Sequence, residues 1–185
     1  MGDYLYMKVR LMSPRKHGAV FFDRDGCLND DIGYLHEWPK FRWLPGAIEA
    51  VRLVNQAGFL TFVVTNQSGV ARGLYSSADV DTIHQNMAAE LARHGAWITS
   101  FRHCPHHPGF PSGDGISGCQ CRKPLPGMVS GLMKSWSVDP GRAFMVGDRE
   151  TDVGAAEAAG IAGFLIEPGN VLPIVRRELR RMKAL

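Results

Sequence analysis

Two aspartate pairs along the chain could share one chemical task. Asp23 and Asp25 stand directly after the apolar run 18–22, and Asp148 and Asp152 follow a second apolar run. Carboxylates that lie together repel one another, and a hard divalent cation with oxygen ligands relieves this repulsion. The alternative is that these residues are helix caps and turn formers, which are common roles of Asp. Their recurrence after separate apolar runs favours a cation site, and Mg²⁺ is the usual ion beside a phosphate.

A second metal site is indicated by the spacing of three cysteines and a histidine. Residues 104–121 read CPHHPGFPSGDGISGCQC, which supplies four ligands in a C-x-H…C-x-C pattern: Cys104, His106, Cys119 and Cys121. Three thiolates and one imidazole suit tetrahedral Zn²⁺, and a site with four protein ligands is structural rather than catalytic. The alternative is a loop of unligated polar residues, although few other interactions could hold a segment so rich in Gly and Pro. His106 keeps the C-x-H spacing, whereas His107 is expected to face solvent or substrate.

Segments so far apart in the sequence need a scaffold that brings them to one place. Short apolar runs alternate with segments of helical periodicity. The expected strands are 18–23, 59–66, 97–104, 143–148 and 161–167. The expected helices are 45–58, 76–95, 124–138, 151–160 and 170–185, the last with Pro173 in its first turn. This alternation predicts a Rossmann-like α/β/α fold of three layers around a mainly parallel sheet, with ligands bound beyond the carboxyl ends of the strands.

Length and composition predict one ordinary globular domain. The chain has 185 residues, of which 45% are hydrophobic, and a formal charge of +3. We expect a single domain over 1–185, with an N-terminal extension at 1–17 that adds an edge strand or is flexible, and a zinc loop at 103–122. No apolar stretch approaches the ~20 residues of a membrane span, and no secretory signal is evident, so we expect a cytoplasmic protein without membrane contact.

Contact with nucleic acid is not expected either. The basic run RRELRRMK carries no aromatic residues and is typical of a solvated helix face. A zinc-ribbon module for nucleic acid is the alternative from another functional class, but 103–121 holds no Lys or Arg and only one aromatic residue, Phe110. We expect a monomer that acts on a small phosphorylated metabolite.

Taken together, four motifs resemble those of the haloacid dehalogenase-like phosphohydrolases. They are DxDGxxN after the first strand, Thr-Asn after the second, Arg-Lys-Pro before a helix and GDxxxD after the fourth, in this order between about 18 and 166. Each motif alone is weak, but the set of four is specific. No large insertion separates the motifs, so we expect no bulky cap domain over the site.

The resemblance implies a role for each motif residue. Asp23 would attack phosphorus and form an aspartyl-phosphate intermediate, and Asp25 would act as general acid and then base. Thr65 would donate a hydrogen bond to the transferring phosphoryl group, and Lys123 would neutralise charge on Asp23 and on the phosphate. Carbon–halogen hydrolysis, the other chemistry of the superfamily, has no task for the carboxylate of Asp25. A phosphoryl-transfer mutase is a further alternative, but such an enzyme usually needs a cap domain that excludes water, and the sequence has no insertion large enough for one.

The same resemblance implies the ligands of Mg²⁺ and the residues that contact substrate. Asp23, the main-chain carbonyl of Asp25, and Asp148 would hold Mg²⁺, with Asp152 in support. The expected substrate contacts are Arg24, Asp31, Ile32, Gly33, Tyr34, Asn66, Gln67, Ser68, Arg122 and Arg149.

The zinc loop narrows the expected substrate. The segments TNQSGVARG, CPHHP and CRKPLPGM are similar to those of the heptose bisphosphate phosphatases, which implies removal of the 7-phosphate of a heptose 1,7-bisphosphate in nucleotide-heptose synthesis. Histidinol-phosphate phosphatases share the zinc loop and are the alternative, as is another small-metabolite phosphatase. Ser68-Gly69 favours the heptose group, whereas Arg149 stands where that group commonly has Lys.

Overall fold

A five-stranded sheet organises the residues that the computed structural model describes, 16–110 and 119–185. The strand order is β3-β2-β1-β4-β5, and every neighbouring pair is parallel. The strands are β1 (His17–Phe22), β2 (Leu60–Asn66), β3 (Ser100–Cys104), β4 (Val138–Gly147) and β5 (Ala162–Leu165). The helices are α1 (Ala47–Gln56), α2 (Ser68–Ala71), α3 (Ser77–Arg93), α4 (Gly127–Ser135), α5 (Glu150–Ala158) and α6 (Val171–Arg181), with a 3₁₀ turn, η1 (Trp38–Lys40).

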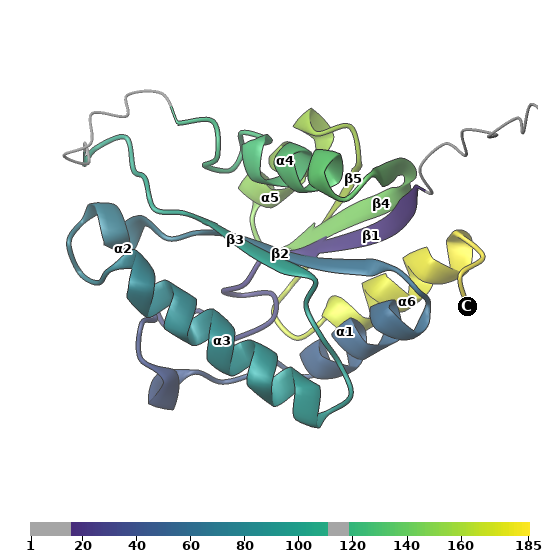
Figure 1. Ribbon diagram of the computed structural model, residues 1–185, viewed down its shortest axis with the longest axis horizontal. Helices are drawn as coiled ribbons and strands as arrows, with labels where there is room; N and C mark the ends of the chain where they lie inside the picture. The colour runs from purple at the N-terminus through teal and green to yellow at the C-terminus, as the bar shows by residue number, and fades with distance from the viewer. Residues whose placement is uncertain (1–15, 111–118) are drawn as a thin grey trace, which may run out of the picture.

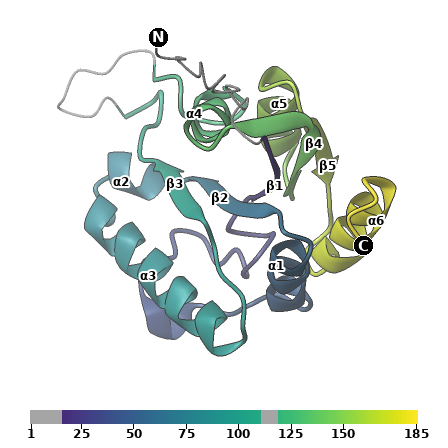
Figure 2. The ribbon, with the colours of Figure 1, turned by 45° about the vertical axis from the view of Figure 1, so that its right-hand side comes forward.

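Helices cover both faces of this sheet (Figures 1 and 2). Helices α4 and α5 lie on one face, and α1, α3 and α6 lie on the other. Alternate residues of β1 are buried in the two resulting cores: Phe21 belongs to the same core as Leu132 of α4, and Phe22 to the same core as Val51 of α1. Because both faces of the strand are covered, its sequence is a continuous apolar run rather than an alternating one. The predicted three-layer α/β/α fold is confirmed.

Local signals set two of the helix ends. The Ser76 side chain accepts a hydrogen bond from the Asp79 amide at 3.2 Å, and the Asp79 carboxylate accepts one from the Ser76 amide at 2.7 Å. This capping box begins α3 where the sequence predicts it. Helix α6 begins at Val171, so Pro173 lies in its first turn, where a missing N–H costs no helical hydrogen bond.

The boundaries of β4 and β3 differ from the prediction. Strand β4 begins at Val138 rather than 143, because Val138 pairs with His17 before a shift of register leads to the pairing of Ala143 with Ala19. Pro140 lies in the irregular stretch and has no N–H to donate, which hides the strand from a pattern search. Strand β3 begins at Ser100 rather than 97. Helix α2 and the turn η1 were not predicted.

Two parts of the predicted organisation lie outside the described residues. These are 1–15, the greater part of the expected N-terminal extension, and 111–118 within the expected zinc loop. Among the described residues, no helix is both long and apolar enough to cross a membrane.

Candidate active site

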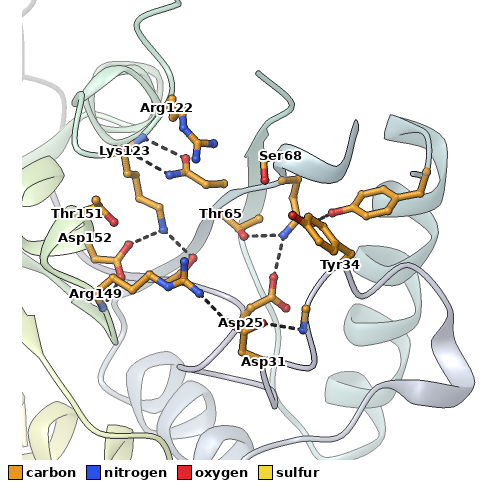
Figure 3. Close-up of a pocket in the computed structure, with 15 residues that line it drawn as sticks. Asp25, Asp31, Tyr34, Thr65, Ser68, Arg122, Lys123, Arg149, Thr151 and Asp152 are labelled. Atoms are coloured by element: carbon orange, nitrogen blue, oxygen red, sulfur yellow. Dashed lines mark hydrogen bonds and ion pairs between the residues drawn. The ribbon is translucent and has the colours of Figure 1, made fainter. Parts of the chain in front are cut away.

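The carboxyl ends of the parallel strands bring the predicted catalytic residues together around Lys123. Its ammonium lies 2.6 Å from Asp23 Oδ1 and 2.6 Å from Asp152 Oδ1, and it donates a hydrogen bond of 2.8 Å to the carbonyl of Val64. Asp23 follows β1, Val64 belongs to β2, and Asp152 lies in the first turn of α5. Figure 3 shows the lysine side chain reaching toward Asp152. One buried cation therefore joins three elements.

Electrostatics show that Lys123 does not neutralise this group of carboxylates alone. Burial raises the pKa of Asp23 to about 7; Lys123 opposes that shift, and the charge of Asp152 adds to it. Burial and the charge of Asp152 also raise the pKa of Asp148, against the influence of Arg149. Burial opposes the charged form of Lys123, but Asp23 and Asp152 outweigh it and raise the lysine pKa. The site would accommodate further positive charge.

The donor set fits a hard divalent cation. One carboxylate oxygen from each of Asp23, Asp148 and Asp152 lies within 4.8 Å of the others. Asp148 Oδ1 is buried and has no hydrogen-bond partner among the described residues. Gly26 lies against this carboxylate: it has φ +83°, and a Cβ at its position would overlap Asp148 Oδ2. A buried carboxylate oxygen that has no hydrogen-bond partner and lies close to two other carboxylates has the environment expected of a Mg²⁺ ligand.

Asp25 sits in a different environment, with four donated hydrogen bonds. Arg24 donates from Nε to Oδ1 (3.1 Å) and from Nη2 to Oδ2 (2.8 Å), while Asn29 and Gln67 donate at 2.9 Å each. Burial acts to raise the pKa of Asp25, but the charge and hydrogen bonds of Arg24 outweigh it and lower the pKa. Arg24 itself is fully buried and does not line the pocket. The structure therefore does not place Arg24, a predicted substrate contact, among the lining residues; its side chain pairs with Asp25.

These residues line a pocket of about 400 Å³, a size typical of small-molecule sites (Figure 3). The lining comprises Asp23, Asp25, Asp31, Gly33, Tyr34, Thr65, Asn66, Gln67, Ser68, Tyr75, Arg122, Lys123, Arg149, Thr151 and Asp152. Of the predicted substrate contacts, Ile32 is absent from this lining and lines a neighbouring hollow with Leu74 and Lys40.

Sequence reasoning missed two of the lining residues, Tyr75 and Thr151. Tyr75 precedes α3 and donates a hydrogen bond of 2.8 Å from its hydroxyl to Gln67 Oε1. Gln67 in turn donates to Thr65 Oγ1 at 2.9 Å, so the tyrosine is linked through Gln67 to the end of β2. No short motif marks Tyr75. Thr151 lies inside the GDxxxD motif and could have been found from its position beside Asp152.

Two arginines line the pocket at its exposed side. Arg149 Nη2 pairs with Asp31 Oδ2 at 2.7 Å, and the arginine side chain is 62% exposed. Arg122 Nη1 donates a hydrogen bond of 3.0 Å to the carbonyl of His106. The pocket therefore combines a buried carboxylate–lysine floor with cationic groups toward solvent.

The four predicted zinc ligands meet beside the pocket. His106 Nδ1 lies 3.4 Å from Cys121 Sγ and 3.6 Å from Cys104 Sγ, and Cys119 Sγ lies 3.7 Å from each of the other two sulfurs. Two sulfurs bound at about 2.3 Å to a tetrahedral ion would be about 3.8 Å apart. The Cys104–Cys121 separation is shorter, 2.9 Å, and all three cysteines are free thiols. The cluster could hold one metal ion. His107 stays outside it, with Nε2 3.4 Å from Arg72.

Comparisons with known proteins agree with this geometry. A family model described as HAD-hydrolase-like matches residues 120–178. The D-glycero-beta-D-manno-heptose-1,7-bisphosphate 7-phosphatase of Rhodopseudomonas palustris is 43% identical over 171 residues, which cover 92% of this chain and 94% of that protein. This chain belongs to the same family of haloacid dehalogenase-like phosphatases. The enzyme of the same name from Yersinia pestis is 40% identical over 77% of this chain and 76% of its own length.

Solved structures of this family share the fold. The D,D-heptose 1,7-bisphosphate phosphatase of B. bronchiseptica, complexed with magnesium and phosphate, is 36% identical, with a TM-score of 0.73 over 89% of this chain and 86% of its own. A protein from Mesorhizobium loti described as a HAD-like phosphatase is 28% identical, with a TM-score of 0.82 over 91% and 88% of the two chains. The predicted superfamily and its phosphatase class are confirmed.

Proposed function

We propose that the protein is a Mg²⁺-dependent phosphatase that removes the 7-phosphate of D-glycero-β-D-manno-heptose 1,7-bisphosphate, in nucleotide-heptose biosynthesis. The observation that carries the proposal is the pairing of Asp23 with Lys123 on the floor of a pocket edged by Arg122 and Arg149. Relatives at 40–43% identity over most of the chain have this activity in their names. The choice of substrate, and of its β-anomer, rests on those names.

Asp23 is the nucleophile in this proposal. A carboxylate oxygen of Asp23 forms a bond to the phosphorus of the 7-phosphate while the bond from phosphorus to the sugar oxygen breaks, which gives an aspartyl phosphate. Lys123 holds Asp23 in position and neutralises charge on the transferring phosphoryl group. Thr65 lines the pocket beside these residues and donates a hydrogen bond to a phosphoryl oxygen.

Asp25 moves the protons. In its protonated form it gives a proton to the departing sugar oxygen; it then takes a proton from the water that cleaves the aspartyl phosphate, and this step releases inorganic phosphate and restores Asp23. The four hydrogen bonds to Asp25 favour its ionised form, which is the form required for the second step. Gln67 and Asn29 fix the direction of its carboxylate.

The metal assignments follow the two ligand clusters. Asp23, Asp148 and the main-chain carbonyl of Asp25 would hold Mg²⁺, and Asp152 would support them from its place between Lys123 and the Arg149 amide. Bound Mg²⁺ offsets the charge of the carboxylates and of the phosphoryl group. Cys104, His106, Cys119 and Cys121 would hold a structural Zn²⁺ that fixes the segment leading to Lys123.

The second phosphate distinguishes this substrate from a metabolite with a single phosphate. Arg149 and Arg122 would bind the 1-phosphate at the open side of the pocket, where Asp31 pairs with Arg149 in the free protein. Exposed ion pairs of this kind are worth only about 0–1 kcal/mol, so an incoming phosphate can take over the arginine at little cost.

Steady-state hydrolysis of a substrate panel tests the proposal. The panel contains the β- and α-anomers of the heptose 1,7-bisphosphate, fructose 1,6-bisphosphate and histidinol phosphate, each with and without Mg²⁺. We expect the highest kcat/KM for the β-anomer, no activity without Mg²⁺, and loss of activity in Asp23→Asn. Asp139→Asn, in β4 and away from the pocket, is the matched control and should retain activity. A preference for histidinol phosphate would refute the substrate, and an active Asp23→Asn variant would refute the mechanism.

A further inference from the structure

A third group of potential metal ligands lies outside the phosphatase pocket and the cysteine cluster. Asp81 and His84 are three residues apart on α3 and so project from the same helix face, and His103 belongs to β3. One ligand atom from each of these side chains lies within 4.8 Å of the other two. None of the three residues lines the phosphatase pocket. The group therefore needs an explanation of its own.

The distance between two of the ligand atoms is close to the distance expected in a metal site. His103 Nδ1 lies 3.8 Å from Asp81 Oδ1. Two ligands bound at about 2.1 Å to a tetrahedral ion would be about 3.4 Å apart, so a small side-chain movement would suffice. The His84 and His103 rings lie with their centroids 6.0 Å apart, and His84 stacks on Phe101 at 4.6 Å, which fixes its ring plane.

His84 is the buried member of this group. Its side chain is 5% exposed, and Nε2 is buried with no hydrogen-bond partner among the described residues. A buried imidazole nitrogen without a partner is costly unless something binds to the ring. Burial lowers the pKa of His84 to about 3, with Arg24 and His103 adding to the shift, so the ring keeps the neutral form that metals bind. Arg24 pairs with Asp25 at 2.8 Å, and at His84 the positive charge of Arg24 has the larger influence of the two.

We propose that Asp81, His84 and His103 form a second transition-metal site, which binds Zn²⁺ or a similar divalent ion and ties α3 to the edge strand β3. Two imidazoles and one carboxylate suit such ions better than Mg²⁺, which prefers oxygen ligands alone. Asp81 is 61% exposed, so the ion would enter from solvent and keep water in its remaining coordination position.

The site would act on the strand that carries the cysteine cluster. Strand β3 is at the edge of the sheet and has a strand neighbour only in β2 among the described residues. It ends at Cys104, directly after His103. Both ribbon views place α3 alongside this strand (Figures 1 and 2). An ion between α3 and β3 would brace the strand from which the cysteine cluster extends, whichever phosphate ester the pocket hydrolyses.

Zinc stoichiometry of the full-length protein tests the proposal. The protein is saturated with Mg²⁺, dialysed against Zn²⁺ and analysed for bound zinc by mass spectrometry. We expect two zinc ions per chain in the unaltered protein, and one in each of three variants: Asp81→Ala, His103→Ala and His84→Phe. The last variant keeps an aromatic ring to stack on Phe101 and removes the ring nitrogens. His94→Ala, at the exposed end of α3, is the matched control and should keep both ions.

Cobalt separates the two sites by their ligands. Co²⁺ bound to thiolates absorbs strongly in the near ultraviolet, whereas Co²⁺ bound to nitrogen and oxygen does not. We expect Asp81→Ala to lose one Co²⁺ equivalent without losing the thiolate absorption, and Cys119→Ser to lose the thiolate absorption while retaining the other equivalent. Bound zinc that is unchanged in Asp81→Ala and His103→Ala would overturn the proposal. Because Asp81 is exposed, its variant is expected to fold, and a thermal scan checks this.

Discussion

At the residue scale, the carboxylate cluster leaves no room for an extra carbon atom. Gly26 follows Asp25 directly and has φ +83°, a conformation that glycine adopts without strain. It also lies against Asp148, whose Oδ1 is buried without a partner among the described residues. The glycine in DxDG therefore does two things: it allows the turn after β1, and it allows the carboxylate of Asp148 to stand close to that turn.

Replacing Gly26 with alanine should weaken Mg²⁺ binding more than it weakens the fold. The new Cβ would displace Asp148, and the left-handed conformation would add strain of about 1–2 kcal/mol. Gly58→Ala is the matched control, because Gly58 has φ +72° and open space at the Cβ position. We expect similar losses of unfolding free energy in the two variants, but a weaker Mg²⁺ affinity, measured by the Mg²⁺ dependence of kcat, only in Gly26→Ala. Equal Mg²⁺ affinity in both variants would contradict this account.

At the element scale, two segments that flank the sheet carry polar side-chain clusters in addition to their apolar packing. The segment between β3 and α4 passes through Cys119 and Cys121 and then directly into Arg122 and Lys123. Helix α6 packs against α1 and buries one charged residue, Glu178, between two arginines of its own helix. The first cluster joins residues from two segments, whereas the second lies within one helix.

Substitution of Cys119 by serine should lower both stability and activity. A serine hydroxyl is a poor zinc ligand, so we expect bound zinc to fall by about one ion per chain and the melting temperature to fall with it. Activity should fall by up to about 100-fold, because a small displacement of Lys123 misplaces the charge beside Asp23. Melting curves, metal analysis and kcat/KM are the measurements. Unchanged zinc content and melting temperature would refute the zinc assignment.

Glu178 should make the stability of α6 depend on pH. Burial acts to raise its pKa, but hydrogen bonds from Arg181 (2.6 Å) and Arg177 (2.8 Å) outweigh burial and lower the pKa below the usual 4.5. A lowered pKa means that this contribution is fully present above pH 4.5 and is lost as the pH falls through the folded-state pKa. We expect Glu178→Gln to cost about 1–2 kcal/mol at pH 7.

Urea unfolding of the two proteins between pH 7 and pH 3 measures this effect. The difference in unfolding free energy should shrink below pH 4.5, where the protonated glutamate resembles glutamine. Glu157→Gln, an exposed position on α5, is the control and should show no such trend. A difference that stays constant down to pH 3 would show that the charge of Glu178 has no part in the stability.

At the scale of the whole molecule, Lys123 joins the layers at the catalytic edge of the sheet. Its three contacts reach Asp23 after β1, Val64 in β2 and Asp152 in α5, and the lysine itself precedes α4. The two apolar cores lie on opposite faces of the sheet and do not link these groups. The ion pairs of Lys123 thus serve the fold and the chemistry together, and removal of the lysine would leave two buried carboxylates without their cation.

Lys123→Met should destabilise the protein by about 3–5 kcal/mol as well as abolish activity, since breaking a buried ion pair leaves an uncompensated charge. Adding Asp152→Asn to that variant should restore part of the stability but none of the activity, because one of the two stranded charges is then removed. Denaturant unfolding of both single variants and the double variant, without Mg²⁺, gives the coupling energy. Strictly additive losses would show that the lysine and Asp152 do not interact as described.

The sequence alone determined the α/β fold class, the order of the motifs, the C-x-H…C-x-C grouping of potential ligands and the start of α3 at its Ser76 cap. Each of these rests on neighbours within a few residues or on recurring motif spacing. Tertiary structure decided which distant groups meet. It paired Asp152 with Lys123 and brought Tyr75 to the pocket.

The same limit applies to His103, which the sequence left without a role. Its partners Asp81 and His84 are about twenty residues away on α3, and only the packing of that helix beside β3 brings them together. Strand β4 began earlier than predicted for a related reason, because its first residue pairs with His17 from the far end of β1. Local patterns fix elements, whereas contacts between elements depend on the packing of the whole sheet, and no short stretch of sequence contains that information.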